Sequence, residues 1–336
     1  MNRLTLVFTA VLALALAATA SAAAGPIATA VEAAAGPASL TKYMPKDATV
    51  VIAVDWSKLA ETGLFDMIEE MSDEDTFEEL EALGIDIEED ITQMMVAVVI
   101  DPEDIEADPA IYIAVAGNLP SEKKFVELYE EEEGEEPESR KVEGKTVYDI
   151  EDVDICFLPG VMLFAPKEDV EADIANMLTG GLAANATLTS LMKDTDTKAT
   201  VWGVASLSKA VRDAIAEEEE NGDDETALKA SALKSVAGSF NYAEKVALDV
   251  QIGFTNKEAA AELVEMFNTQ VKPLGEQLAE MMPEAAELIK ALKMNATGSK
   301  ATVSMKLDRD DFEAAVESFV GMMFGAMMGG VEFEGE

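Results

Sequence analysis

Two short hydrophobic runs divide the chain into similar halves. The first run, Val50 to Val54, is continuous and β-branched, which predicts a buried strand. Asp55 follows as a candidate N-cap, and the next residues, "WSKLAETGLFDMIEEM", carry apolar side chains at helical spacing. The second run, Val201 to Ala205, is followed by Ser206 as a candidate N-cap and by a second predicted helix.

The two runs lie within a repeated phrase. "ATVVIAVDWSK" starts at Ala48 and "ATVWGVASLSK" starts at Ala199. The identical pairs are Ala48 and Ala199, Thr49 and Thr200, Val50 and Val201, Ser57 and Ser208, and Lys58 and Lys209. The phrase therefore indicates that each half begins in the same way.

The pattern after each phrase extends the similarity. In the first half, apolar strands at 94–100 and 110–119, a helix from Pro120, strands near 145–165 and a closing helix follow in order. In the second half, a hairpin over 235–254, a helix with a capping box at Thr255, a strand at 301–307 and a closing helix follow. We therefore predict an α+β fold, a tandem duplication of a unit in which helices pack on one face of an antiparallel sheet.

This prediction sets the domain organisation. Two separately packed domains and one continuous sheet are both compatible with it. The predicted boundaries are a signal peptide over 1–22, a flexible Ala/Gly/Pro lead over 23–42, a first α+β unit over 43–185, a second α+β unit over 186–330 and an acidic tail over 331–336.

The N-terminus predicts export. Arg3 precedes an apolar segment, and Ala20-Ser21-Ala22 fits the small-x-small rule for signal peptidase. A transmembrane anchor would need about 20 apolar residues, and the residues that follow are Ala, Gly and Pro. We therefore expect a periplasmic or extracellular protein with no transmembrane anchor after signal cleavage.

The net charge is extreme. The chain has 67 Asp and Glu but only 24 Lys and Arg, which gives a formal charge of −43. Self-repulsion of this size destabilises a compact state unless salt screens it, which indicates a halophilic-type surface and a melting temperature that rises steeply with NaCl. Nucleic acid is excluded as a direct partner, because binding it requires clustered Lys and Arg.

The composition also limits the chemistry. The chain has no His, which removes His-based nucleophilic catalysis and most catalytic zinc sites. Cys156 is the single cysteine, and its apolar neighbours predict a buried structural thiol. Three S-x-x-K matches, at Ser121, Ser206 and Ser231, lack the partner motifs of penicillin-recognising enzymes. We therefore predict no enzyme activity, no cofactor, no catalytic residue and no dedicated metal site.

The most distinctive segment is the end of the closing helix, "FVGMMFGAMMGG". Gly321, Gly325 and Gly329 share one helical face, and Met322, Met323, Met327 and Met328 surround it. Small residues at this spacing allow close helix packing, either on the protein's own sheet or in an association surface for self-pairing or an apolar ligand. Both interpretations stay open from the sequence.

Two stretches carry a resemblance to known proteins. "YMPKDATVVIAVDWSKLAETGLF" and "LGIDIEEDITQMMVAVV" resemble a loose group of secreted bacterial proteins of unknown function, which share a turn, a β-branched strand and a short helix at this place. The resemblance implies an exported α+β domain and carries no catalytic residues to transfer.

The leading functional hypothesis is a secreted or periplasmic, non-enzymatic binding or structural protein of the cell envelope, which binds an unknown protein or an apolar ligand. One alternative is a hydrolase that uses carboxylates or a Ser–Lys pair. Another is an acidic cation-binding surface protein, although the acidic tracts 129–139 and 217–225 lack the ligand spacing of an EF-hand.

Overall fold

The computed structural model describes residues 37–60, 84–86, 89–101, 109–150, 153–167, 172–179, 181–221, 230–273, 283–316 and 318. In the first half these form η1 (Pro37–Tyr43), β1 (Val50–Asp55), α2 (Trp56–Ala60), β2 (Ile91–Val99), β3 (Ala110–Gly117), α5 (Glu122–Glu133), β4 (Glu138–Val142), β5 (Lys145–Ile150), β6 (Val153–Leu158), β7 (Val161–Pro166), α6 (Ala172–Thr179) and η2 (Leu182–Ala184). The second half forms α7 (Ala186–Lys193), β8 (Val201–Ser206), α8 (Lys209–Asn221), η3 (Ala230–Ala232), β9 (Leu233–Asn241), β10 (Lys245–Phe254), α9 (Lys257–Met266), the π-helical η4 (Phe267–Val271), α11 (Pro283–Ala291), β11 (Lys293–Thr297) and β12 (Lys300–Asp308). Helical residues 309–316 follow β12.

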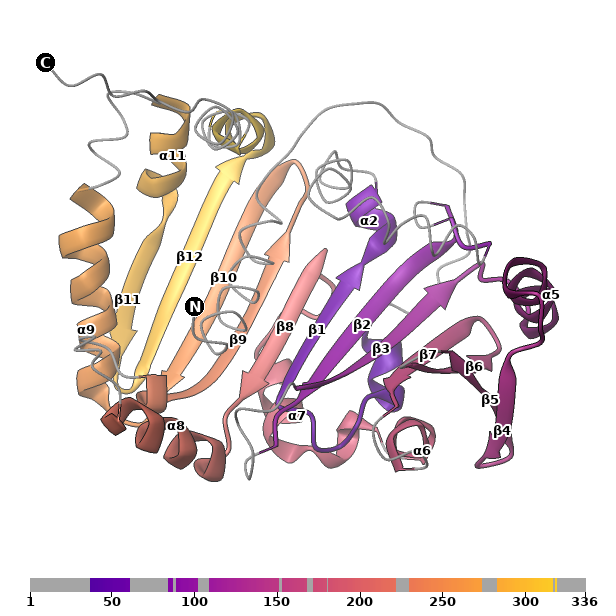
Figure 1. Ribbon diagram of the computed structural model, residues 1–336. Coiled ribbons are helices and arrows are strands. Elements are labelled where there is room, and N and C mark those ends of the chain that lie inside the picture. Colours follow the sequence, from indigo (N-terminus) through magenta and orange to yellow (C-terminus); the bar gives the residue numbers. More distant parts are fainter. Residues whose placement is uncertain are drawn as a thin grey trace, which may run out of the picture.

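All twelve strands join one antiparallel sheet in the order β11-β12-β10-β9-β8-β1-β2-β3-β7-β6-β5-β4 (Figure 1). This confirms the predicted α+β class with a large antiparallel sheet. Read outward from the middle, the first half runs β1-β2-β3-β7-β6 and the second runs β8-β9-β10-β12-β11, with the same connections. The hairpin β4–β5 extends the first half only.

The repeated phrase forms the two central strands. β1 and β8 pair antiparallel, with Val50 opposite Ala205, Ile52 opposite Gly203 and Val54 opposite Val201. Ile52 and Gly203 occupy the same place in the two phrases, so this pairing is symmetric about them. A quasi-two-fold axis therefore passes between Ile52 and Gly203, perpendicular to the sheet, and the halves form one continuous sheet.

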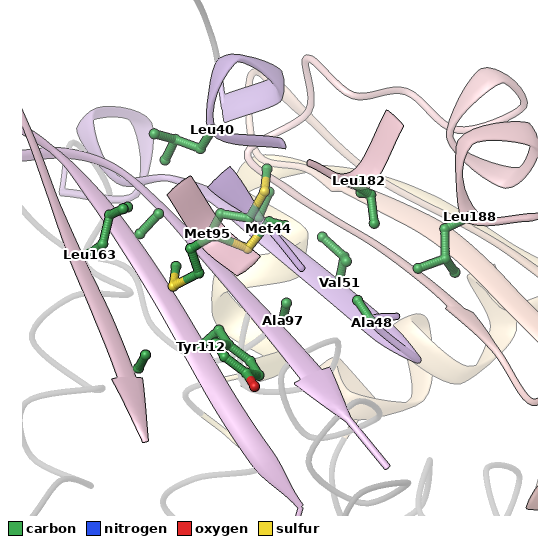
Figure 2. Close-up of a cluster of buried hydrophobic side chains, with 14 of the residues drawn as sticks. Leu40, Met44, Ala48, Val51, Met95, Ala97, Tyr112, Leu163, Leu182 and Leu188 are labelled. Atoms are coloured by element: carbon green, nitrogen blue, oxygen red, sulfur yellow. The ribbon is translucent and has the colours of Figure 1, made fainter. Parts of the chain in front are cut away.

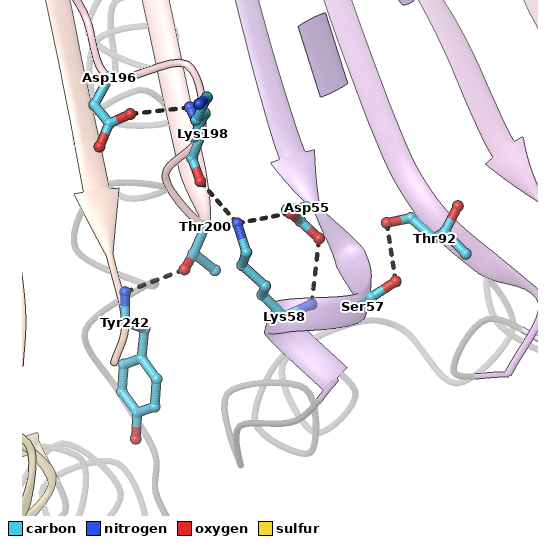
Figure 3. Close-up of polar contacts among 8 residues, drawn as sticks. All are labelled: Asp55, Ser57, Lys58, Thr92, Asp196, Lys198, Thr200 and Tyr242. Carbon is cyan, nitrogen blue, oxygen red and sulfur yellow. Dashed lines mark hydrogen bonds and ion pairs between the residues drawn. The ribbon is translucent and has the colours of Figure 1, made fainter. Parts of the chain in front are cut away.

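Backbone hydrogen bonds repeat across this axis. The Asp55 N–H donates to the Thr200 carbonyl over 2.8 Å, and the Ser206 N–H donates to the Thr49 carbonyl over 2.9 Å. The buried Thr200 hydroxyl accepts from the Tyr242 N–H over 3.1 Å (Figure 3), and the Thr49 hydroxyl accepts in the same way from the Ile100 N–H over 3.4 Å. These equivalent contacts extend the quasi-two-fold symmetry from β1 and β8 to β2 and β9.

One contact breaks the symmetry of the junction. The Lys58 ammonium donates to the Lys198 carbonyl over 2.7 Å and pairs with the Asp55 carboxylate over 2.9 Å (Figure 3). The equivalent Lys209 pairs instead with Asp213 on its own helix, over 2.5 Å. Lys58 therefore ties the first unit to the segment that leads into β8.

Alternate side chains of the strands face two different hydrophobic clusters. The Val51 face carries Val51, Ala53, Ala114 and Leu163, and it packs against Leu40 and Met44 of η1, Ile174 and Met177 of α6, Leu182 of η2 and Leu188 of α7 (Figure 2). The Ile52 face carries Val54, Val115, Met162 and Phe240, and it packs against Trp56 and Leu59 of α2, Phe125 of α5, and Phe312 and Val316 of residues 309–316.

The structure differs here from the expectation that helices pack on one face, because helices contact both. The reason lies in the central strands: a continuous run such as Val50 to Val54 has apolar side chains on both faces, and each face needs cover. Part of the predicted flexible lead over 23–42 is helical. Residues 37–42 belong to η1, where Leu40 is 1% exposed.

Two of the three predicted helix caps are displaced. Asp55 accepts from the Lys58 N–H as expected, over 3.4 Å. In the second unit Ser208, and not Ser206, accepts from the Val211 N–H at the start of α8. Asn256, and not Thr255, caps α9 by accepting from the Ala259 N–H. In both cases the sheet uses the earlier residue, because the Ser206 and Thr255 N–H groups donate to carbonyls of other segments.

Candidate binding face

The association helix predicted from the sequence lies outside the described residues, including Gly321, Gly325, Gly329, Met322, Met323, Met327 and Met328. Its N-terminal part, residues 309–316, is described and is helical as predicted. Whether those seven residues pack on the protein's own sheet or form an association surface therefore stays open.

The residues considered for catalysis have structural roles. The Ser121 hydroxyl accepts from the Lys124 N–H and caps α5. Cys156 is fully buried, as predicted, and burial raises the pKa of its thiol to about 11. Within the described ranges, no group of three or more His, Cys, Asp or Glu side chains could hold a metal ion. The acidic tracts continue α5 to Glu133 and α8 to Asn221.

The closing helix of the second unit shows how a helix is seated on the Ile52 face. Phe312 is fully buried, with its ring centroid 6.0 Å from that of Phe240 and 6.2 Å from that of Tyr242. The Tyr242 hydroxyl donates to the Glu313 carboxylate, which also accepts from Arg309 Nε over 2.6 Å. Burial raises the pKa of Tyr242, and the Glu313 carboxylate raises it further. The helix is therefore anchored by an aromatic cluster with a polar rim.

The closing helix of the first unit lies on the opposite face. α6 places Ile174 and Met177, both fully buried, in the cluster of the Val51 face. A two-fold axis perpendicular to the sheet would put both closing helices on the same face. The helices that follow β7 and β12 therefore break the symmetry that the strands obey.

Among the residues that the structure describes, two strand residues of the first unit lack the equivalent cover. Register through the axis matches Val98 to Phe240 and Ile111 to Leu248. Leu248 packs against the cluster of the Ile52 face, whereas neither Val98 nor Ile111 belongs to any cluster formed by the described residues. Ile111 is 49% exposed. It lies near the start of β3, before the first β3 residue that pairs with β7, so β2 alone flanks it in the sheet.

A second asymmetry lies in the adjacent row of the same face. The row crosses eight strands, and its equivalent pairs are Ile52 and Gly203, Val96 and Gly238, Ile113 and Val250, and Phe164 and Val303. In every pair the residue of the second unit is smaller. Gly203 and Gly238 lie directly opposite each other on β8 and β9, so the sheet has no side chain there.

Neither glycine is required by backbone conformation, because neither has a positive φ. A Cβ at Gly238 would lie 2.9 Å from Val250 Cγ2, and a Cβ at Gly203 would lie 3.3 Å from the Val51 carbonyl oxygen. Glycine within a strand weakens it and commonly marks a place where another chain or a ligand approaches closely. The pair therefore lets neighbouring strand residues, Val250 above all, pack closely over β8 and β9.

We call Ile52, Val96, Val98, Ile111, Gly203 and Gly238 the central apolar face. It has no ionisable group, so it can bind only by contact and burial of apolar surface. Sequence reasoning missed all six residues. The signal was present in the repeated phrase, where Ile52 aligns with Gly203 although both sit in apolar strands.

Comparison with known proteins does not assign the chain to a family. No family model matches the sequence, and no curated protein matches it. Solved structures of TP0453 are similar in three crystal forms, at 11% identity in each case. Crystal form III gives a TM-score of 0.46 over 83% of this chain and 97% of that chain, form IV gives 0.45 over 83% and 95%, and form I gives 0.42 over 86% and 99%. This likeness carries no inference about function.

The helices offer no sign of a membrane span. Within the ranges that the structure describes, none combines the length and hydrophobicity that crossing a bilayer requires.

Proposed function

We propose that the protein is an exported, non-enzymatic binding protein of the cell envelope, which holds an apolar surface of a partner against the central apolar face. The observation that supports this most directly is the 49% exposure of Ile111, whereas the equivalent Leu248 of the second unit packs against the buried cluster of the Ile52 face. Export rests on the signal sequence that ends near Ala22.

The energetics favour such a role. Complete burial of a fully exposed side chain the size of Val or Ile contributes about 1.5–3 kcal/mol. Ile111, which is 49% exposed, can contribute part of that, and the partly buried Ile52, Val96 and Val98 contribute less. The face offers no acid, base or nucleophile, so binding without chemistry is the function that these side chains can perform.

The test uses the mature chain, from Ala23 onward, and the neutral dye Nile red, which fluoresces strongly in apolar surroundings. We expect the dye to bind, and Ile111→Glu to weaken its affinity at least tenfold, or about 1.4 kcal/mol, by placing a charge on the face. Val153→Glu is the matched control, because Val153 is also an exposed strand residue, 37%, but lies on β6 outside the central apolar face.

The control variant should bind like the wild type. Absence of dye binding by the folded wild type, or equal loss in both variants, would contradict the proposed function. Urea unfolding of each variant confirms that the comparison is made between folded proteins.

Localisation has its own test. N-terminal sequencing of the protein recovered from the envelope fraction of expressing bacteria should find the chain starting at or near Ala23. An intact N-terminus at Met1 in that fraction would contradict signal cleavage.

A further inference from the structure

We infer that the partner surface is an amphipathic helix. It packs over Val98 and Ile111 in the way that residues 309–316 pack over Phe240 in the second unit. This inference rests on the proposed function and names the partner of the same face. The quasi-two-fold axis is perpendicular to the sheet, so it relates the two places on one face. One of them holds a helix in the structure, and the strands beneath the other have the same register.

The seated helix defines what the partner must carry. Phe312 and Val316 are four residues apart, on one side of the helix, and are 0% and 4% exposed. The polar residues Arg309 and Glu313 lie at the rim, where they contact Tyr242. A partner helix therefore needs large apolar side chains at helical spacing on one face and polar side chains on the other.

One strand side chain beneath the proposed partner helix is smaller than its equivalent beneath residues 309–316, which favours larger side chains on the partner. Val98 is smaller than its equivalent Phe240, so a side chain above it can reach closer to the sheet. An aromatic or long aliphatic anchor fits this relief better than a short side chain does.

The first unit's own closing helix cannot supply this cover without loss elsewhere. α6 would have to leave the Val51 face, where Ile174 and Met177 are fully buried, and expose both. Each exposure would forfeit a burial free energy of the size that the new site would return. α6 is therefore not the occupant, and we assign this place to a second polypeptide.

The net charge of the chain indicates which polar side chains the partner helix carries. The chain carries a formal charge of −43, so an acidic helix is repelled at moderate ionic strength and a basic or neutral one is favoured. We assign the partner as a helix with a basic polar face, recognised by its apolar anchors.

The experiment measures displacement of Nile red from the mature chain by a synthetic Lys-bearing amphipathic peptide with Phe and Leu anchors at helical spacing. A second peptide of identical composition has the anchors scrambled, so that it has the same charge without an apolar face. Titrations at about 1 M NaCl, where the Debye length is about 3 Å, suppress attraction that depends on charge alone.

We expect the patterned peptide to displace the dye at least tenfold more strongly than the scrambled peptide, with a rise in its helical circular dichroism on binding. Ile111→Glu should abolish this difference, and Val153→Glu should preserve it. Equal displacement by both peptides, or none, with dye binding intact would overturn the helical partner and leave the proposed function standing. A dimer of the mature chain in sedimentation that Ile111→Glu dissociates would also overturn it, in favour of a second copy as occupant.

Discussion

The two units share a strand order, a junction and a set of backbone contacts, but they place their closing helices differently. In the second unit Phe312 and Val316 follow β12 directly onto the Ile52 face. In the first unit α6 crosses to the Val51 face, where it joins η1 and α7. A repeated sequence thus reproduces strands and their register, because these depend on local pattern and on pairing. It does not reproduce the placement of the helices that follow β7 and β12. We expect binding on the Ile52 face of the first unit, which α6 does not cover.

The largest predicted effect contrasts two equivalent core positions at the junction. Trp202→Ala should lower the free energy of unfolding by about 3–5 kcal/mol, whereas Val51→Ala at the matching position should cost about 2 kcal/mol. Both residues are at most 1% exposed on the Val51 face, so the difference reflects the volume removed. Urea unfolding followed by circular dichroism measures both losses. Equal losses would contradict the expected dependence on the side-chain volume removed.

The next prediction concerns a feature that the second unit lacks. Arg140 on β4 forms a bidentate ion pair with Asp154 on β6, donating to Oδ1 over 2.8 Å, and the Asp154 side chain is 1% exposed. Asp154→Asn leaves the guanidinium without its counter-charge and should cost about 3 kcal/mol. Replacement of both partners, by Arg140→Met with Asp154→Leu, should recover to within about 1 kcal/mol of the wild type. A double variant no more stable than the single one would show that the pair is needed for more than neutralisation.

A smaller effect on stability is expected at Tyr148, whose hydroxyl holds α5 through Glu122. The Tyr148 hydroxyl donates to Glu122 over 2.9 Å, and burial, followed by the Glu122 carboxylate, raises the pKa of Tyr148 to about 12. The folded state therefore keeps this proton while the unfolded state loses it near its ordinary pKa of about 10, so Tyr148 makes stability fall as pH rises from about 10 to about 12. Tyr148→Phe should cost about 1–2 kcal/mol at neutral pH and should flatten this part of the decline. Urea midpoints across that range test it, and parallel curves for the two proteins would contradict it.

Much of this architecture could be predicted from local pattern. The apolar runs located β1, β2, β3, β8 and β12, the hairpin predicted over 235–254 is formed by β9 and β10, and the repeated phrase marked the start of each unit. The displaced caps at Ser208 and Asn256 depended on which backbone groups the sheet had already used, which is tertiary information.

The candidate face was beyond such reasoning for a related reason. Ile111 looks like any core residue of an apolar strand. Its exposure goes with the packing of α6 on the other face and with the end of the β3–β7 pairing at Ile113, and both are tertiary information. The buried pair of Arg140 and Asp154 was likewise invisible among 67 acidic residues, because its partners meet across an intervening strand.

The most direct test places the same substitution at the two equivalent positions. Leu248→Glu puts a charge against the buried cluster of the Ile52 face and should lower the free energy of unfolding by about 2–4 kcal/mol, whereas Ile111→Glu should change it by less than about 0.5 kcal/mol. Urea unfolding of the two mature variants under one salt condition measures the contrast. A large difference in this direction supports an open, helix-sized position over Ile111; equal destabilisation would mean that Ile111 is covered in the folded protein and that no such position exists.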